Sequence, residues 1–211
     1  MTRALVVFES MFGNTERVAR AVAMGLAEHI HVDLVRAGPG ITFRDDIDLV
    51  VVGGPTHAFG MSRPSTRVSA GQQGAGESAA SGNGLREWLD MLGEPTAHRP
   101  ATAAFDTRVR KPGVPGSAAR SAARRLRHAG LPVVVPPMSF WVRGTGGPLL
   151  PGEEDRARSW GRELARTGTV INAGVNRDYS GLTLGSTRQY FDHAWEMFTD
   201  AALHPSFAAL G

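Results

Sequence analysis

Short runs typical of β-strands alternate with helical patterns through residues 1–168 of this 211-residue chain, and that alternation limits the fold more than any other feature. Strands are expected at Arg3–Phe8, at His31–Arg36 and at residues 48–53, 101–105 and 131–135, the last continued in extended form by residues 139–143. Residues 49–52 are apolar throughout, as in the central strand of a parallel sheet that is covered on both faces. Helical spacing of apolar residues follows the first strand and recurs at residues 85–92, 116–128 and 153–166. This order predicts an α/β protein with a doubly wound sheet and right-handed crossovers.

Two segments do not fit this alternation. Residues 70–84 are rich in Gly, Ser and Ala and carry a single charge, which is typical of a mobile surface loop. Beyond residue 168, residues 186–203 place Phe191, Trp195 and Phe198 on one helical face. We therefore divide the chain into a domain of residues 1–168 and a C-terminal helical extension of residues 169–211. Because its apolar stripe needs burial, we expect this extension to be a packing or oligomerisation arm.

The sequence contains no cysteine, which excludes disulfides, thiolate metal sites and catalysis by a cysteine nucleophile. Any redox function therefore depends on a bound cofactor. His29 and His31 have no third metal ligand beside them, so no metal site is expected. No apolar run reaches the roughly 18 residues of a membrane helix, and a strand begins almost directly after Met1. We expect a soluble cytoplasmic protein with neither a signal peptide nor a membrane span.

The positive charge of the chain is concentrated in one segment. The 23 basic and 20 acidic residues give a net charge of +3, yet between Arg99 and Arg127 stand eight basic residues and one acid, Asp106. The eight are Arg99, Arg108, Arg110, Lys111, Arg120, Arg124, Arg125 and Arg127. Such an excess favours an anionic ligand or partner, although a solvated helix face explains part of it equally well. Because the chain has no recognised DNA-binding motif, nucleic acid is not the expected partner.

The loop after the first strand, Ser10-Met-Phe-Gly-Asn-Thr15, has the composition of a phosphate site. A phosphate needs inward-pointing amides, hydroxyl donors and the positive end of a helix dipole, and a turn of this composition that enters a helix supplies all three. The same residues also fit a capped turn without a ligand. The Gly-Lys-Ser/Thr ending of a nucleotide-triphosphate loop is absent. Gly144-Thr-Gly-Gly147 does not fit a dinucleotide loop, because prolines and Leu149 follow it, and we assign it no role.

Two further segments follow strands and therefore lie at the same edge of the expected sheet. Gly53 to Gly60 (GGPTHAFG) offers the imidazole of His57 and the ring of Phe59 to a flat heteroaromatic ligand, although His57 also fits an exposed loop position. A third loop, Phe105-Asp-Thr-Arg108, offers polar groups for hydrogen bonds to a ring edge or a ribityl chain. Together the three segments predict a site for a phosphorylated flat cofactor.

In these motifs residues 1–168 resemble the flavodoxin family, which binds flavin mononucleotide (FMN). The resemblance implies a five-stranded parallel sheet in the order 2-1-3-4-5. It implies that the FMN phosphate is held by Ser10, Asn14 and Thr15 with the backbone amides of Met11, Phe12, Gly13, Asn14 and Thr15. It implies that the isoalloxazine ring is contacted by Pro55, Thr56, His57, Phe59 and Gly60, and by Asp106, Thr107 and Arg108 of the third loop.

The resemblance also implies a function, an electron carrier that uses FMN to shuttle electrons between a flavin reductase and an acceptor enzyme. An enzyme is the alternative, an FMN-dependent NAD(P)H:quinone or nitro-compound oxidoreductase, of a kind that often forms oligomers. Typical flavodoxins are markedly acidic, whereas this chain is basic. If Arg108, Arg110 and Lys111 lie near the ring, they favour its anionic reduced form and raise the second reduction potential.

Overall fold

Five parallel strands form the central sheet, in the order β2-β1-β3-β4-β5. They are β1 (Arg3–Phe8), β2 (His31–Arg36), β3 (Leu49–Pro55), β4 (Ala101–Val109) and β5 (Met138–Val142). This arrangement confirms the predicted order 2-1-3-4-5. The central strand β3 is buried from Leu49 to Gly54, as its apolar composition requires.

The computed structural model describes residues 2–42, 44, 46–57, 60–75, 84–92, 99–110, 116–167, 170–175 and 180–185. Residues 2–165 belong to one compact unit that contains the whole parallel sheet, and residues 166–211 belong to a second unit. The second unit contains an antiparallel hairpin of β6 (Val170–Val175) and β7 (Ser180–Gly185). Neither strand was predicted, and the sequence of residues 175–185 is polar and glycine-containing. The helix expected at residues 186–203 lies outside the described residues.

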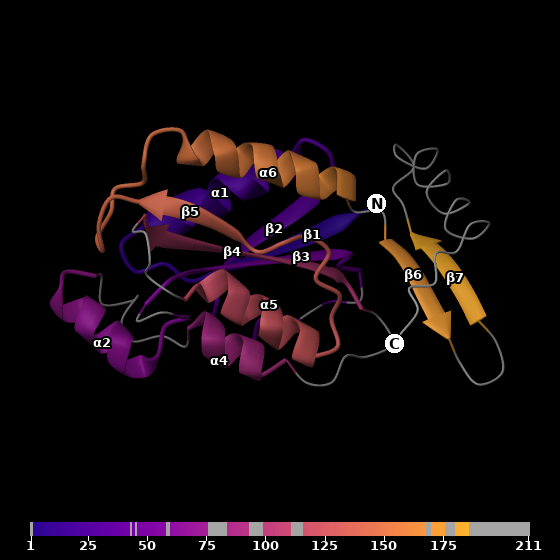
Figure 1. The fold of residues 1–211 in the computed structure, drawn as a ribbon, viewed down its shortest axis with the longest axis horizontal. Helices are drawn as coiled ribbons and strands as arrows, with labels where there is room; N and C mark the ends of the chain where they lie inside the picture. Colours follow the sequence, from indigo (N-terminus) through magenta and orange to yellow (C-terminus); the bar gives the residue numbers. More distant parts are fainter. Residues whose placement is uncertain are drawn as a thin grey trace, which may run out of the picture. The chain divides into compact units, whose positions relative to one another are not determined.

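Helices cover both faces of the parallel sheet (Figure 1). α1 (Asn14–Ala27) and α6 (Glu153–Thr167) lie on one face, and α4 (Leu85–Asp90) and α5 (Ala118–His128) lie on the other. α2 (Pro64–Gln72) lies beyond the carboxyl ends of the strands. Among the residues described, no helix combines the length and the apolar character that a membrane crossing requires.

The core has one half on each side of the sheet. On the α4–α5 side, Val50 and Val52 of the central strand belong to one buried cluster with Trp88. On the α1–α6 side, the rings of Phe105, Phe140 and Trp160 meet edge to face, with centroids 6.0 to 6.2 Å apart.

The prediction of a fifth strand at residues 131–135 is wrong. The fifth strand is β5, and in the earlier segment only Val133 forms a bridge, to Thr102. Pro132, Pro136 and Pro137 have no N–H to donate to a ladder, so regular pairing with β4 begins only at Met138.

Two further elements differ from expectation. The helix α2 occupies a stretch where no helix was predicted, because only Arg67 and Ala70 of it are buried and no apolar stripe marks it. β4 continues through Val109, so the residues expected to form a third loop, 106–108, belong to a strand. Residues 76–83 of the expected surface loop lie outside the described residues.

The helices α1 and α6 cross with their backbones in contact. A Cβ atom on Gly161 would stand 2.3 Å from the Val22 carbonyl oxygen, and one on Gly25 would stand 2.0 Å from the Arg158 carbonyl oxygen. We expect Gly161→Ala to lower the free energy of unfolding by about 1–3 kcal/mol, because the two backbones must separate. Urea unfolding measures the change. Met24→Ala is the control. Met24 of α1 is 54% exposed, so this substitution should change the free energy of unfolding by less than about 0.5 kcal/mol. An unchanged midpoint for Gly161→Ala would contradict the close crossing.

Candidate functional site

The loop between β1 and α1 turns sharply at Gly13. Gly13 has φ +81°, a left-handed conformation that side-chain-bearing residues rarely adopt, and α1 begins at the next residue. Nothing lies within 4 Å of the place where a Cβ atom would stand on Gly13, so the glycine is required by the backbone conformation and not by crowding.

Several donors in this loop have no acceptor. No side chain caps α1, and no hydrogen bond from the described part of the chain reaches the backbone amides of Met11 through Glu16. The Ser10 side chain is 3% exposed, and its buried Oγ has no hydrogen-bond partner among the described residues. Buried polar groups are normally paired, so this hydroxyl marks an incomplete site. An uncapped helix N-terminus beside a spare hydroxyl is suited to an anion.

The segment after β3 is held by its backbone. The Thr56 N–H donates to the Thr107 carbonyl oxygen at 2.9 Å, while His57 and Gly60 exchange backbone hydrogen bonds of 2.8 and 2.9 Å. These bonds close a tight turn at the carboxyl end of the central strand. Its tip, Ala58 and Phe59, lies outside the described residues, so the ring contact expected of Phe59 stays a prediction.

The Asp106 carboxylate is hydrogen-bonded to the start of α5. Its carboxylate has no exposed surface, and Oδ2 accepts hydrogen bonds from Thr56 Oγ1 at 2.9 Å, Ser117 Oγ at 2.5 Å and the Ala119 N–H at 3.1 Å. Asp106 thus joins the segment after β3 to the first turn of α5. In the structure it positions the neighbours of the site and does not line the cavity.

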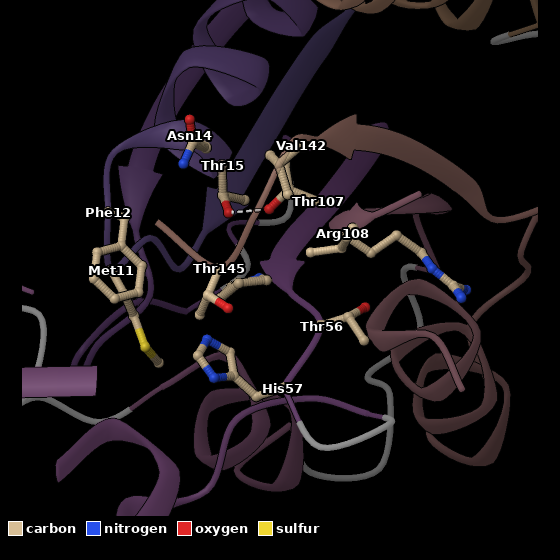
Figure 2. Close-up of a pocket in the computed structure, with 12 residues that line it drawn as sticks. Met11, Phe12, Asn14, Thr15, Thr56, His57, Thr107, Arg108, Val142 and Thr145 are labelled. Atoms are coloured by element: carbon tan, nitrogen blue, oxygen red, sulfur yellow. Dashed lines mark hydrogen bonds between the residues drawn. The ribbon is translucent and has the colours of Figure 1, made fainter. Parts of the chain in front are cut away.

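The next two residues of β4 do line the cavity. Thr107 Oγ1 shares a buried hydrogen bond of 2.7 Å with Thr15 Oγ1, which links β4 to the first turn of α1. The Arg108 guanidinium lies 5.7 Å from the centroid of the Trp141 ring. Figure 2 shows it directed away from His57, so the positive charge of Arg108 lies toward β5.

These elements surround one cavity at the carboxyl edge of the sheet (Figure 2). The residues that line it are Met11, Phe12, Asn14, Thr15, Pro55, Thr56, His57, Thr107, Arg108, Val109, Val142 and Thr145. The structure thus brings together members of all three segments expected from the sequence. Ser10, Gly13, Gly60 and Asp106 are not among the lining residues. Lys111 lies outside the described residues, and Arg110 is exposed after the end of β4.

A fourth segment, which received no role from the sequence, reaches the cavity from the end of β5. Asn14 Nδ2 donates to the Gly146 carbonyl oxygen at 3.0 Å, and a Cβ atom on Gly147 would stand 2.4 Å from that nitrogen. The glycines therefore let residues 144–147 lie directly on Asn14, and Thr145 enters the cavity between Thr15 and His57 (Figure 2). A glycine-rich stretch directly after a strand was the available signal.

His57 is the titratable group of the cavity with a resolved shift. Burial of its imidazole lowers its pKa below the ordinary value of 6.5, and the negative charge of Glu9 opposes part of this change. Glu9 is itself buried, with Oε2 accepting the Leu85 N–H at 2.8 Å. His57 is therefore neutral over most of the physiological range and offers its ring as a flat, uncharged surface.

The lowered pKa of His57 predicts a pH-dependent contribution to stability. The unfolded chain takes up the His57 proton near its ordinary pKa of about 6.5, and the folded chain does so only at lower pH. The contribution is therefore complete above about pH 6.5 and is lost as the pH falls through and below that value. Between about pH 7.5 and about pH 5.5, we expect the wild type to lose more stability than His57→Gln in urea unfolding. An NMR titration should give a His57 midpoint below about 6.5. A midpoint above it would contradict the prediction.

A sheet of order 2-1-3-4-5 with a glycine-bearing loop from β1 into α1 defines the flavodoxin-like class of α/β proteins. No model of a known protein family matches the sequence, and no curated protein does. Among solved structures, flavodoxin 1 from Bacillus cereus is similar with a TM-score of 0.56 at 16% identity, over 78% of this chain and 98% of that one.

Two more flavodoxins show the same likeness. One from the domain Archaea has a TM-score of 0.52 at 17% identity, over 79% of this chain and 99% of its own. One from Streptococcus pneumoniae TIGR4 has a TM-score of 0.54 at 16% identity, over 78% of this chain and 98% of its own. At these identities the likeness concerns the fold. The chain has the flavodoxin-like fold that the sequence motifs imply.

Proposed function

We propose that this chain binds FMN at the carboxyl edge of its sheet and transfers electrons through it. The observation that carries the proposal is the unpartnered Ser10 hydroxyl, buried in a loop that enters the uncapped α1. A phosphate group would accept from the donors that this loop leaves unpaired. The flavodoxin-like fold places such a loop at the point where the sheet order reverses, where doubly wound proteins bind their ligands.

The charges around the loop fit a phosphate dianion. Glu16, in the first turn of α1, would repel it, but its carboxylate is paired with Arg20 at 2.7 Å and with Arg36 at 2.8 Å. Arg36 also donates to the Ser10 carbonyl oxygen at 2.9 Å, which braces the loop from behind. The acid is thereby neutralised, and the dipole of α1 remains available to the ligand.

The other lining residues suit the rest of FMN. The bound flavin would supply one-electron and two-electron redox chemistry, for which a chain without cysteine has no thiol of its own. Thr107, whose hydroxyl shares a hydrogen bond with Thr15 of the phosphate loop, lines the cavity where a ribityl chain would run. His57, with Pro55 and Thr56, would flank the isoalloxazine ring, and Asp106 holds that segment in place through Thr56.

We further propose that the flavin serves a carrier that exchanges electrons with partner proteins in the cytoplasm. An enzyme that passes hydride from NAD(P)H to a quinone or nitro compound is the competing outcome. Steady-state oxidation of NADPH with a soluble quinone separates the two. The carrier should show no turnover above that of free FMN, and saturable turnover would replace this part of the proposal.

The phosphate site predicts a specific loss of FMN affinity in Ser10→Ala. A hydrogen bond to a charged group is worth about 1.5–3 kcal/mol, so the dissociation constant should rise about 10-fold to 100-fold. Quenching of FMN fluorescence by the apoprotein measures it. Ser69→Ala, which removes a hydroxyl bonded only to the Ser65 carbonyl oxygen on exposed α2, is the matched control and should bind FMN like the wild type. Equal affinity for both variants would contradict the assignment.

We also propose that residues 169–211 form a packing or oligomerisation arm. Residues 2–165 make a compact unit that contains every lining residue of the cavity. A chain ended after residue 168 should therefore still bind FMN, while size-exclusion chromatography should show a different oligomeric state, or a loss of solubility, relative to the full chain. An unchanged oligomeric state together with unchanged solubility would contradict the arm.

A further inference from the structure

Three arginines of α1 and α6 form ion pairs that join the two helices. Arg17 of α1 lies 2.8 Å from Glu154 at the start of α6. At the other end of the same helices, Arg158 and Arg162 both lie 2.8 Å from Glu28. These pairs span the two helices, so the positive charge on this face is matched by negative charge within hydrogen-bonding distance.

The arginines of α5 are arranged differently. Arg120, Arg124 and Arg127 are exposed, and none of them forms an ion pair with an acid in the part of the chain that the structure describes. Arg125 is the exception, paired with Asp90 at 2.8 Å. Positive charge in the last turn, as at Arg127, is favoured by the helix dipole. Arg120 lies in the first turn, where a positive charge is disfavoured, so helix stability does not account for it.

The first two turns of α5, which carry Arg120 and Arg124, adjoin the candidate site. The Arg124 guanidinium lies 3.5 Å from Ser121 Oγ, and Ser121 Oγ lies 3.7 Å from the place where a Cβ atom would stand on Gly60. In the turn before, the Ala118 N–H donates to Thr56 Oγ1 at 2.9 Å. The first two turns of α5 therefore lie directly against the segment proposed to flank the flavin ring.

Two more arginines border the same segment. The Arg86 guanidinium donates to the carbonyl oxygens of Met61 and Ser62 at 2.8 Å each, and Arg63 is exposed at the next position. Burial lowers the pKa of Arg86, and repulsion from Arg125 and Arg63 adds to that effect. Arg86 and Arg63 are thus close enough to act on one another, and both border the segment that the start of α5 also contacts. We name Arg63, Arg86, Arg120 and Arg124 the arginine rim.

We propose that the arginine rim is the docking surface for an acidic redox protein that exchanges electrons with this chain. This inference rests on the FMN function proposed above. Guanidinium groups bind carboxylates with two parallel hydrogen bonds, and complementary charge raises association rates about 10-fold to 1,000-fold at low ionic strength. A protein docked on the rim would bring its own redox centre to the ring-flanking segment. A nucleic acid would satisfy the charges but carries no redox centre.

Two small haem proteins of opposite charge test the rim, acidic cytochrome b5 and basic cytochrome c. The FMN-loaded protein is reduced with dithionite and mixed with each oxidised cytochrome in a stopped-flow instrument. One reduced anionic flavin gives two electrons to two ferric haems, which become ferrous, and one proton to water. At low ionic strength we expect Arg120→Glu/Arg124→Glu to lower the rate constant with cytochrome b5 by about tenfold or more and to raise it with cytochrome c.

The matched control is Arg44→Glu/Arg158→Glu. It changes the net charge by the same amount as the rim variant, at two positions outside the rim. Neither substitution leaves the acid beside it without an ion pair, because Asp46 remains paired with Arg3 and Glu28 remains paired with Arg162. The control should keep the wild-type rate with cytochrome b5. An equal decrease of the rate constant with cytochrome b5 in both double variants would show that net charge alone causes the effect, and would contradict the proposed docking surface.

Other outcomes separate the two levels of the proposal. A chain that takes up no FMN refutes the proposed function, whereas a chain that takes up FMN and reduces both cytochromes at rates insensitive to the rim refutes only this inference. Binding of a DNA duplex that is tighter than binding of oxidised cytochrome b5, and is lost in the rim variant, would also overturn it. Because glutamate in the first turn favours the helix, the rim variant should unfold no earlier than the wild type.

Discussion

The buried carboxylate of Asp106 is the contact on which the geometry of the candidate site depends. One of its oxygens accepts hydrogen bonds from the segment after β3, from the N-cap of α5 and from the first turn of α5. Two parts of the chain that are distant in sequence, the segment after β3 and the start of α5, are thereby fixed to the same atom. Because a buried polar group is stable only where it is hydrogen-bonded, Asp106 Oδ2 and the donors of these two parts of the chain stabilise one another.

The residue after Asp106 extends this control to the other half of the site. Because successive side chains of a strand point to opposite faces, Thr107 is directed toward α1 when Asp106 is directed toward α5. Its hydroxyl shares a hydrogen bond with that of Thr15, the last residue of the loop proposed for phosphate and part of the first turn of α1. Two consecutive residues of β4 therefore fix the position of the segment after β3 relative to the loop proposed for phosphate.

The pattern of residues within a single segment was sufficient to predict several strands of the fold. The strands Arg3–Phe8 and His31–Arg36 begin and end where their runs of residues predict, and the apolar run at residues 49–52 is the central strand. The fifth strand was misplaced because residues 131–135 have the composition of a strand, and only the prolines around them prevent regular pairing. α2 was missed because it buries little and shows no periodicity.

The limits of prediction at the site have a similar cause. Ser10 to Thr15 and Pro55 to His57 were predicted as site residues because their chemistry is contiguous in sequence, and members of both segments line the cavity. Asp106 was assigned to a loop, and only the continuation of β4 shows that it faces inward. The contact of Asn14 with Gly146 joins residues 132 positions apart, and no local signal reports a partner at that distance.

The net charge can be counted from the sequence, but the positions of the charged residues in space cannot. A net charge of +3 is small, and by itself it says little about partners. On the α1–α6 side, acids such as Glu28 and Glu154 pair with arginines, so they cannot offset the arginines at the start of α5. The local excess beside the ring-flanking segment therefore exceeds what the net charge suggests. The placement of the acids, more than their number, therefore determines where positive charge stays without an ion pair among the described residues, and this is the surface that we propose for an acidic partner.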